Sequence, residues 1–387
     1  MGTQIQTQEH TVPVSGKGID VGKIEKELAA MWKPADEAEG SNAGSGVTRA
    51  CALNLIVYST VEDDREAIDD MLDTVNEYHP GRTLVLLADR EAAEPKLDAY
   101  VSTRCRVLGG SGKQVCGEQV TIEASGASVE RAASAIAPLL VPDVQTFLWW
   151  KDIPHYEDKL FNRLAAMSDR VVIDSSCFDR PHEDLSRLAQ IIRDDPQFMS
   201  VSDLNWGRLT AWRTLLANFW DIADYHPYLN AVDRIAVEYD PPDAATEEIA
   251  PKALLVTGWL ASRLGWDVVG RNTGKSNVTF ILRKNERDIN VEMTATEHEG
   301  HGDGMLVSLT LSSSSSGAEF YVAFSDDRKN LITEASIDGK RTVGRVLSYE
   351  QKTEGRRLSR ELGLAKRDVI YEEALAVAAR LIEALSA

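Results

Sequence analysis

The sequence predicts an α/β N-terminal domain, with a mixed, mainly parallel sheet and helices on both faces, followed by a C-terminal α+β domain with an antiparallel sheet. Between residues 50 and 225, apolar strand-like runs alternate with amphipathic helical runs, which is typical of parallel sheets. Beyond residue 265, short strands follow one another between turns, which is typical of antiparallel sheets. A length of 387 residues exceeds what one hydrophobic core commonly serves and favours two domains.

Three regions follow from these patterns: an extension and linker at 1–49, the α/β domain at 50–225 and the α+β domain at 226–387. Residues 1–18 are polar and are expected to be disordered. A helix is predicted at 19–32, where apolar residues recur at helical spacing, and Pro34 is expected to end it. Residues 35–48 are rich in Gly, Ser, Ala and acidic residues, a composition typical of flexible linkers.

The α/β domain is predicted from alternating elements. Strands are expected at 50–59, 82–88, 100–107, 114–124, 145–150 and 170–174. Helices are expected at 61–78, 129–140, 157–167, 182–193 and 203–221. The first strand, helix and strand form a βαβ unit, which implies parallel pairing.

The α+β domain is predicted to open with a helix at 246–264. Short strands are expected at 277–282, 288–294, 305–311 and 320–324. Two helices within 356–386 are expected to close the chain.

Charge and hydropathy exclude several classes of partner. The 61 acidic and 42 basic residues give a formal charge of -19, which repels a phosphate backbone and disfavours nucleic acid. The sequence contains no run of about 18 apolar residues, so a membrane span is not expected. The polar N-terminus lacks the apolar stretch of a secretory signal. The sequence therefore predicts a cytoplasmic protein that binds neither nucleic acid nor membrane.

Residues 340–367 depart from the acidic average. This stretch holds nine basic and three acidic residues, with Arg356 and Arg357 adjacent in it. Two interpretations stand: a solvated face, or a docking surface for an acidic partner or a phosphorylated ligand.

The motifs that would carry catalysis are incomplete. Residues 270–276 (GRNTGKS) have three residues between the glycines where a phosphate-binding loop needs four, and a strand-like run follows instead of a helix. Residues 298–301 (HEGH) lack the spacing that places two histidines on one helical face. No G-x-S-x-G motif is present, and no G-x-G-x-x-G follows the first strand. We therefore assign no catalytic residue, metal or cofactor.

Four cysteines occur, at Cys51, Cys105, Cys116 and Cys177, without C-x-x-C spacing. Cys105 and Cys116 flank a glycine turn, and a hairpin formed there brings the two sulfurs close. This pair is the candidate redox site, because a disulfide in a cytosolic protein is more often regulatory than structural.

Two segments concentrate tryptophan and arginine, the residue types that dominate interface hot spots. One is Trp149 and Trp150 at a strand end, where neighbouring side chains point to opposite faces. The other is 203–213 (DLNWGRLTAWR), where Asp203 suits a helix N-cap. The candidate partner-binding residues are Trp149, Trp150, Asp203, Asn205, Trp206, Arg208, Trp212, Arg213, Arg356 and Arg357. The alternative interpretation is core packing for the tryptophans and an ion pair for the arginine.

These segments resemble a known family. Residues 141–143 (VPD) with 147–150 (FLWW), residues 203–213, and 174–176 (DSS) are similar to patterns of the glucose-6-phosphate dehydrogenase assembly protein (OpcA) family. Residues 254–266 resemble its second-domain helix, and 77–82 resemble its HPxR turn, although Gly81 departs from the cysteine of some members. The resemblance covers about residues 50–385.

The resemblance implies a non-catalytic partner and activator of glucose-6-phosphate dehydrogenase in the oxidative pentose phosphate pathway. In cyanobacterial members the family is linked to oligomerisation and redox control of the enzyme, with thioredoxin as a candidate second partner. An alternative function is an enzyme or binding protein acting on a sugar phosphate or nucleotide-sugar, which would need a phosphate-binding motif. A further alternative is a scaffold for another partner.

Overall fold

The protein forms two compact units in the computed structural model. The structure describes residues 7–12, 19–39, 47–107, 113–155, 157–194, 200–243, 245–274, 277–297, 304–325, 328–342, 344–349, 353–364 and 366–386. The first unit comprises Met1–Ile173, Asp195–Ser202 and Thr353–Arg367. The second comprises Asp174–Asp194, Asp203–Lys352 and Asp368–Ala387. Each unit therefore combines segments that are distant in the sequence.

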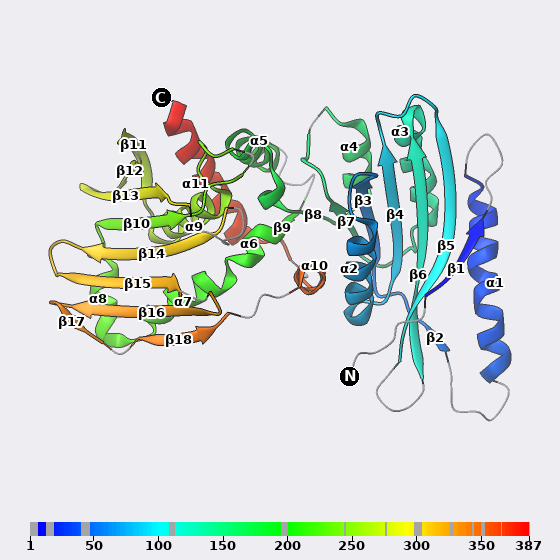
Figure 1. The fold of residues 1–387 in the computed structure, drawn as a ribbon, viewed down its shortest axis with the longest axis horizontal. Helices are drawn as coiled ribbons and strands as arrows, with labels where there is room; N and C mark the ends of the chain where they lie inside the picture. The colour runs from blue at the N-terminus through cyan, green and yellow to red at the C-terminus, as the bar shows by residue number, and fades with distance from the viewer. Residues whose placement is uncertain are drawn as a thin grey trace. The chain divides into compact units, whose positions relative to one another are not determined.

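The sheet of the first unit has the order β1-β5-β6-β4-β3-β7-β8-β9, with β2 beside β6 (Figure 1). Its strands are β1 (Thr7–Val12), β2 (Val47–Arg49), β3 (Asn54–Thr60), β4 (Arg82–Asp89), β5 (Lys96–Val107), β6 (Gln114–Ser125), β7 (Thr146–Trp150), β8 (Arg170–Ile173) and β9 (Val201–Asp203). β3 pairs in parallel with β4 and β7, β4 with β6, and β7 with β8. β5 is antiparallel to β1 and β6. The prediction of a mixed, mainly parallel sheet is confirmed.

The centre of this sheet is apolar on both faces. Every residue of β3 from Asn54 to Ser59 is buried, so both faces of the strand are covered, as in other parallel sheets. The helices of the first unit are α1 (Val21–Glu39), α2 (Arg65–Tyr78), α3 (Val129–Ile136), α4 (Lys159–Ala165) and α10 (Glu354–Leu362). α2 begins where Asp64 caps the backbone N–H groups of Glu66 and Ala67.

The N-terminal extension differs from expectation in two places. Residues 7–12 form β1, paired with β5, where disorder was predicted. This pairing satisfies backbone groups that β5 would otherwise leave open on its edge. α1 continues past Pro34 to Glu39, so the proline does not end the helix, at the cost of one backbone hydrogen bond.

The sheet of the second unit has the order β11-β12-β13-β10-β14-β15-β16-β17, with β18 beside β16 (Figure 1). Its strands are β10 (Arg234–Tyr239), β11 (Asp267–Thr273), β12 (Asn277–Lys284), β13 (Arg287–Ala295), β14 (Leu306–Ser313), β15 (Ala318–Phe324), β16 (Asn330–Ile337), β17 (Lys340–Arg341) and β18 (Arg345–Ser348). The predicted antiparallel order holds except at β10, which runs parallel to β13. The strands β10, β11, β16, β17 and β18 were not predicted, although β10 lies in the middle of the sheet.

The helices of the second unit are α5 (Pro181–Asp194), α6 (Leu204–Arg208), α7 (Thr210–Trp220), α8 (His226–Leu229), α9 (Pro251–Leu264) and α11 (Val369–Ser386). The single long helix expected at 203–221 is divided into α6 and α7 at Leu209. α9 and α11 pack closely at Gly258, where an added Cβ would lie 2.2 Å from the carbonyl oxygen of Ala374. Glycine thus allows the two helix backbones to approach each other.

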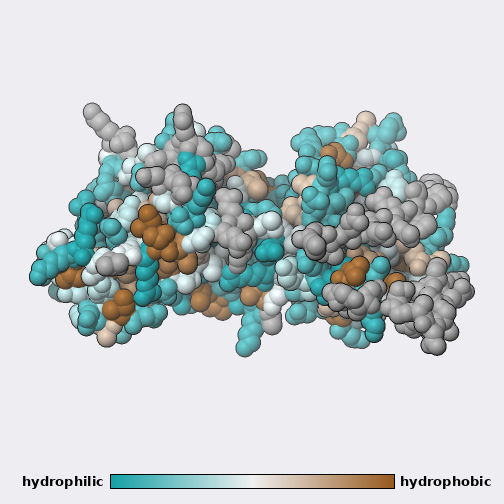
Figure 2. Space-filling view, turned by 60° about the horizontal axis from the view of Figure 1, so that its bottom comes forward, coloured by the Kyte–Doolittle hydropathy of each residue, from teal (hydrophilic) through white to brown (hydrophobic). Residues whose placement is uncertain are grey.

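The visible surface agrees with the high content of charged residues in the sequence (Figure 2). Figure 2 shows a face covered mostly by hydrophilic residues, with hydrophobic residues in a few separate patches (Figure 2). Among the helices in the described ranges, none combines the length and apolar character needed to cross a bilayer.

Candidate functional site

A buried polar cluster in the second unit unites two of the segments singled out in the sequence. Asp203 is fully buried and caps α6 by accepting a hydrogen bond from the backbone N–H of Asn205 at 2.9 Å. Its carboxylate also accepts from the backbone N–H of Ser175 at 3.0 Å and from the Ser175 hydroxyl at 2.7 Å. The Tyr371 hydroxyl donates to it at 3.3 Å. One carboxylate thus connects the 174–176 turn, α6 and α11.

A second carboxylate lies beside the first. Asp174 accepts two hydrogen bonds from the Arg208 guanidinium, one to each oxygen and both 2.7 Å long. Ser176 donates to Asp174 from its backbone N–H at 3.1 Å and from its hydroxyl at 2.6 Å. The bidentate ion pair holds the turn against α6, because planar guanidinium and carboxylate groups match in geometry.

The two carboxylates differ in acidity. Burial raises the pKa of Asp174, but the hydrogen bonds and charge of Arg208 outweigh burial, so the pKa lies below its usual value. Burial, and secondly the charge of Asp174, raises the pKa of Asp203 to about 6. Burial also raises the pKa of Tyr371, with the Asp203 carboxylate as a further cause. Tyr371 therefore remains a hydrogen-bond donor at neutral pH.

The aromatic residues of the 203–213 segment pack in the same unit. Trp206 is 2% exposed, and its indole N–H donates to Asp368 at 2.9 Å. The Arg213 guanidinium lies 3.5 Å from the centre of the Trp206 ring. Trp212 is 3% exposed and meets Phe324 edge to face at 5.4 Å. These contacts place both tryptophans in the core.

Trp149 and Trp150 lie in the central sheet of the first unit and are 2% and 0% exposed. Trp150 stacks on Tyr58 with ring centres 3.8 Å apart and meets Phe161 edge to face at 5.0 Å. Both faces of β7 are covered, which explains how two neighbouring tryptophans can both be buried. Core packing therefore describes the four tryptophans, and a role for them in partner contact stays a prediction.

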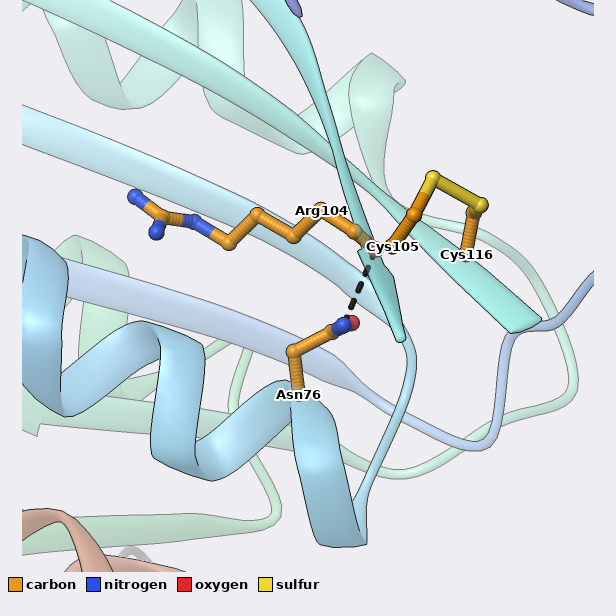
Figure 3. Close-up of a disulfide and its surroundings, with 4 residues drawn as sticks. All are labelled: Asn76, Arg104, Cys105 and Cys116. Carbon is orange, nitrogen blue, oxygen red and sulfur yellow. Dashed lines mark hydrogen bonds between the residues drawn. A yellow bond between two sulfur atoms is a disulfide. The ribbon is translucent and has the colours of Figure 1, made fainter. Parts of the chain in front are cut away.

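Cys105 and Cys116 form a disulfide in the first unit, directly opposite each other on β5 and β6 (Figure 3). Their Cα atoms are 4.0 Å apart. Next to the disulfide, the Asn76 side chain of α2 donates to the Arg104 carbonyl at 2.9 Å. The Arg104 guanidinium forms ion pairs with Asp69 and Asp73 of α2. The bridge is therefore adjacent to the anchor of α2 on the sheet.

The basic stretch at 340–367 is divided between the two units at Lys352 and Thr353. In α10, Arg356 is exposed, whereas Arg357 pairs with Glu354 and its side chain is 15% exposed. α10 is fixed to α2 within the first unit. The His79 ring nitrogen lies 2.7 Å from the Ser359 carbonyl oxygen, and Gly355 lies against Thr74.

The incomplete catalytic motifs of the sequence analysis lie partly within the described residues. Residues 270–273 belong to β11, and β12 begins at Asn277, so a strand and not a helix comes next in the described chain; residues 275–276 lie outside the described residues. Residues 298–301 lie outside the described residues, as does the whole glycine turn at 108–112. Within the described ranges, acidic, histidine and cysteine side chains form no group of three or more suited to a metal.

Sequence reasoning missed several members of these clusters. Asp368 and Tyr371 join the α6 residues from more than 160 positions along the chain, and no local pattern indicates that meeting. The buried pair of Arg82 and Glu118, 2.7 Å apart, was also missed. Glu118 further accepts from the Trp32 indole N–H at 2.7 Å and thereby ties α1 to the sheet. Arg82 belongs to the HPxR-like turn, which was the available signal.

Most of the chain matches two domain models of one protein family. Residues 73–190 match the family described as glucose-6-phosphate dehydrogenase subunit N-terminal domain, and residues 199–375 match its C-terminal domain. A myo-inositol dehydrogenase from Lactobacillus casei shares 10% identity at a TM-score of 0.44, over 87% of this chain and 95% of that one. An oxidoreductase domain protein from Kribbella flavida shares 11% at 0.42, over 88% and 96%. Likenesses this weak carry no inference about chemistry.

Two curated relatives bear the provisional name OxPP cycle protein OpcA. The protein from Nostoc punctiforme is 30% identical over 295 residues, which is 74% of this chain and 62% of the relative. The protein from Synechocystis is 27% identical over 325 residues, which is 80% of this chain and 65% of the relative. The chain thus spans less than two thirds of the length of either relative. On the two domain matches and these relatives, the chain belongs to the OpcA family of glucose-6-phosphate dehydrogenase assembly proteins.

Proposed function

We propose that the chain is a non-catalytic assembly factor that binds glucose-6-phosphate dehydrogenase and allosterically activates it in the cytoplasm. The strongest support is that polar side chains of the family-like segments are hydrogen-bonded within the protein. Arg208 donates two hydrogen bonds to Asp174, and Asp203 accepts hydrogen bonds from the backbone N–H groups of Ser175 and Asn205. Side chains used in this way stabilise a rigid unit, which suits a binding protein.

Activation by binding requires a difference in affinity. An assembly factor raises activity only if it binds the active state of the enzyme more tightly than the inactive state. The exposed Arg356 on α10 is a candidate contact, because a cation on an acidic protein can steer a partner that presents acidic groups.

Redox modulation belongs to the same proposal, with Cys105 and Cys116 as its site. A dithiol reductant, with thioredoxin as the candidate, would transfer two electrons and two protons to the bridge and become a disulfide itself. Both cysteines would then carry thiols. The strands β5 and β6 that the bridge joins adjoin α2, against which α10 packs, so a change at the bridge can reach the helix that carries Arg356. The route from the disulfide to α10 is argued from spatial contact between neighbouring elements.

The test mixes the purified chain with purified glucose-6-phosphate dehydrogenase and records light-scattering mass and turnover together. The complex is expected to be heavier than the enzyme alone, and catalytic efficiency is expected to change as the chain approaches equimolar amounts. The chain alone is expected to show no turnover. Unchanged mass and unchanged activity at micromolar concentrations would refute the assembly function.

The redox part has a matched control in the double variant Cys105→Ser, Cys116→Ser. Wild-type chain is expected to activate differently before and after reduction, whereas the double variant is expected to respond identically under both conditions. Equal activation by oxidised and reduced wild-type chain would remove the redox part and leave the assembly part standing.

A further inference from the structure

One edge of the second sheet lies open to solvent. β17 and β18 follow each other along the outer side of β16, and no described strand pairs with their far side (Figure 1). Every residue of β18 is exposed, and Val346 and Leu347 are 66% and 47% exposed. An edge strand with exposed apolar side chains and no proline is a template for pairing with another strand.

The backbone of β18 presents polar groups on this outer side. The Arg345 N–H donates to the Thr333 hydroxyl of β16 at 3.3 Å, and that hydroxyl donates to the Arg345 carbonyl at 3.4 Å. The Tyr349 N–H donates to the carbonyl of the residue before β16 at 2.7 Å. Along an antiparallel strand, the N–H and C=O groups of successive residues point alternately to the two sides. Since Arg345 and Tyr349 point toward β16, Val346 and Ser348 point away from it, toward the open edge.

The same edge is basic. Residues 340–348 hold three basic residues and no acidic one, in a chain with a formal charge of -19. Lys340 and Arg345 are exposed and form no ion pair with the described residues. Arg341 lies 3.8 Å from Glu334, and its side chain is 78% exposed. These charges repel the same edge of a second copy and attract an acidic strand.

A small pocket beside this edge favours one apolar side chain. Its volume is about 50 Å³, and its lining includes Leu215, Phe219 and Ile222 together with Thr342 and Arg345 of the edge. When a peptide adds a strand to a sheet, main-chain hydrogen bonds supply affinity, and pockets for alternate side chains supply specificity. The pocket suits a small apolar side chain, and the neighbouring Arg345 suits a carboxylate.

We propose that the edge formed by β17 and β18 binds an extended segment of glucose-6-phosphate dehydrogenase that combines acidic with apolar residues. The segment adds a strand to the second sheet. This inference rests on the proposed function, because it names a surface through which the chain binds the enzyme. The added strand forms backbone hydrogen bonds with Val346 and Ser348, and its carboxylates lie near Lys340, Arg341 and Arg345.

Hydrogen exchange of the full chain, measured by mass spectrometry with and without the dehydrogenase, tests this surface. Peptides that contain Val346 and Ser348 are expected to exchange at least tenfold more slowly in the complex, because the outward amides become paired. Peptides of β11, at the opposite end of the sheet, are expected to exchange at an unchanged rate. Absence of a complex would refute the proposed function and the inference with it. A complex without this protection would refute the inference alone.

Two substitutions of Val346 separate the backbone from the side chain. Val346→Pro removes an outward N–H, which an edge position tolerates. It is expected to weaken binding of the dehydrogenase at least tenfold at an unchanged melting temperature. Val346→Ala keeps the N–H and is expected to weaken binding less. Equal losses in the two variants would show that no strand pairs with this edge.

A charge substitution has a matched control on the opposite edge. Val346→Asp is expected to weaken binding at least tenfold, because it repels an acidic strand. Val269→Asp makes the same change at an exposed valine of β11 and is expected to bind as wild type does. Equal binding by all three proteins, or equal losses in both variants, would overturn the proposal. A dimeric mass of the chain alone that Val346→Asp reduces to a monomer would overturn it too, by assigning the edge to a second copy.

Discussion

At the scale of single residues, Asp174 and Asp203 show how position sets acidity. Both are carboxylates of one cluster, yet Arg208 lowers the pKa of the first against the effect of burial. Asp203 is fully buried without an ion-pair partner of its own in the described cluster. Burial therefore dominates and raises its pKa to about 6.

This shift predicts a pH dependence. Between pH 4 and 6 the folded Asp203 binds a proton that an unfolded aspartate releases, so its contribution to stability rises as pH falls through this window. About two pKa units correspond to roughly 3 kcal/mol. The unfolding free energy of wild type relative to Asp203→Asn is expected to be larger at pH 4.5 than at pH 7, as measured by urea denaturation. A difference that stays constant or shrinks at pH 4.5 would contradict the assignment.

Trp150 provides the second residue prediction. Trp150→Ala is expected to lower the unfolding free energy by about 3–5 kcal/mol, because it removes a buried ring stacked on Tyr58. Trp150→Phe is the matched control, and its loss is expected to be smaller. It keeps an aromatic ring, and the indole N–H has no hydrogen-bond partner among the described residues. If the alanine variant keeps wild-type stability but releases the dehydrogenase faster, Trp150 is a contact residue instead.

At the scale of elements, the close packing of α9 on α11 depends on one missing methyl group. Gly258→Ala is expected to destabilise the protein by about 1–3 kcal/mol, because the new Cβ would overlap the Ala374 carbonyl and push the helices apart. The sign of the change in unfolding free energy is informative, because glycine to alanine at an open helix position would stabilise the protein by about 1 kcal/mol.

Thermal unfolding measures this change, with Gly363→Ala as the control. Gly363 ends α10 with φ of -81°, and its nearest neighbour would lie 3.4 Å from an added Cβ. That variant is expected to be nearly neutral. Equal melting temperatures for Gly258→Ala and wild type would show that the two helices are not held at this distance.

At the scale of the whole molecule, the net negative charge makes an exposed cation such as Arg356 a candidate for steering a partner. Arg356→Glu is expected to slow association with the dehydrogenase several-fold and to flatten its dependence on salt, because steering by charge acts mainly on the association rate. Surface-plasmon measurements at two ionic strengths follow both effects. Arg357 pairs with Glu354 and is expected to contribute less.

Arg193→Glu is the control for this prediction, since it makes the same charge change on α5 of the second unit. Association rates that fall equally in the two variants would indicate an effect of net charge. A docking face on α10 would then be excluded.

Much of the architecture follows from local patterns. The alternation of apolar and helical runs predicts the two sheets, most strands of the first sheet and the strands β12 to β15 of the second, because the side-chain period is set by each element's own geometry. Asp203 is predicted as a helix cap for the same reason, since the cap bonds the N–H of a near neighbour. The closeness of Cys105 and Cys116 is also local, because a hairpin alone sets their register.

Other features depend on contacts between distant segments. Burial of the four tryptophans, the parallel pairing of β10 with β13, and the meeting of Asp203 with Tyr371 each join parts of the chain that share no local signal. The stretch at 340–367 is continuous in sequence but belongs to two units. The sequence by itself determined the fold class, the family segments and the cysteine pair. Only the tertiary structure decided which of those side chains are core and which face solvent, because burial is a property of all the segments that pack around a residue.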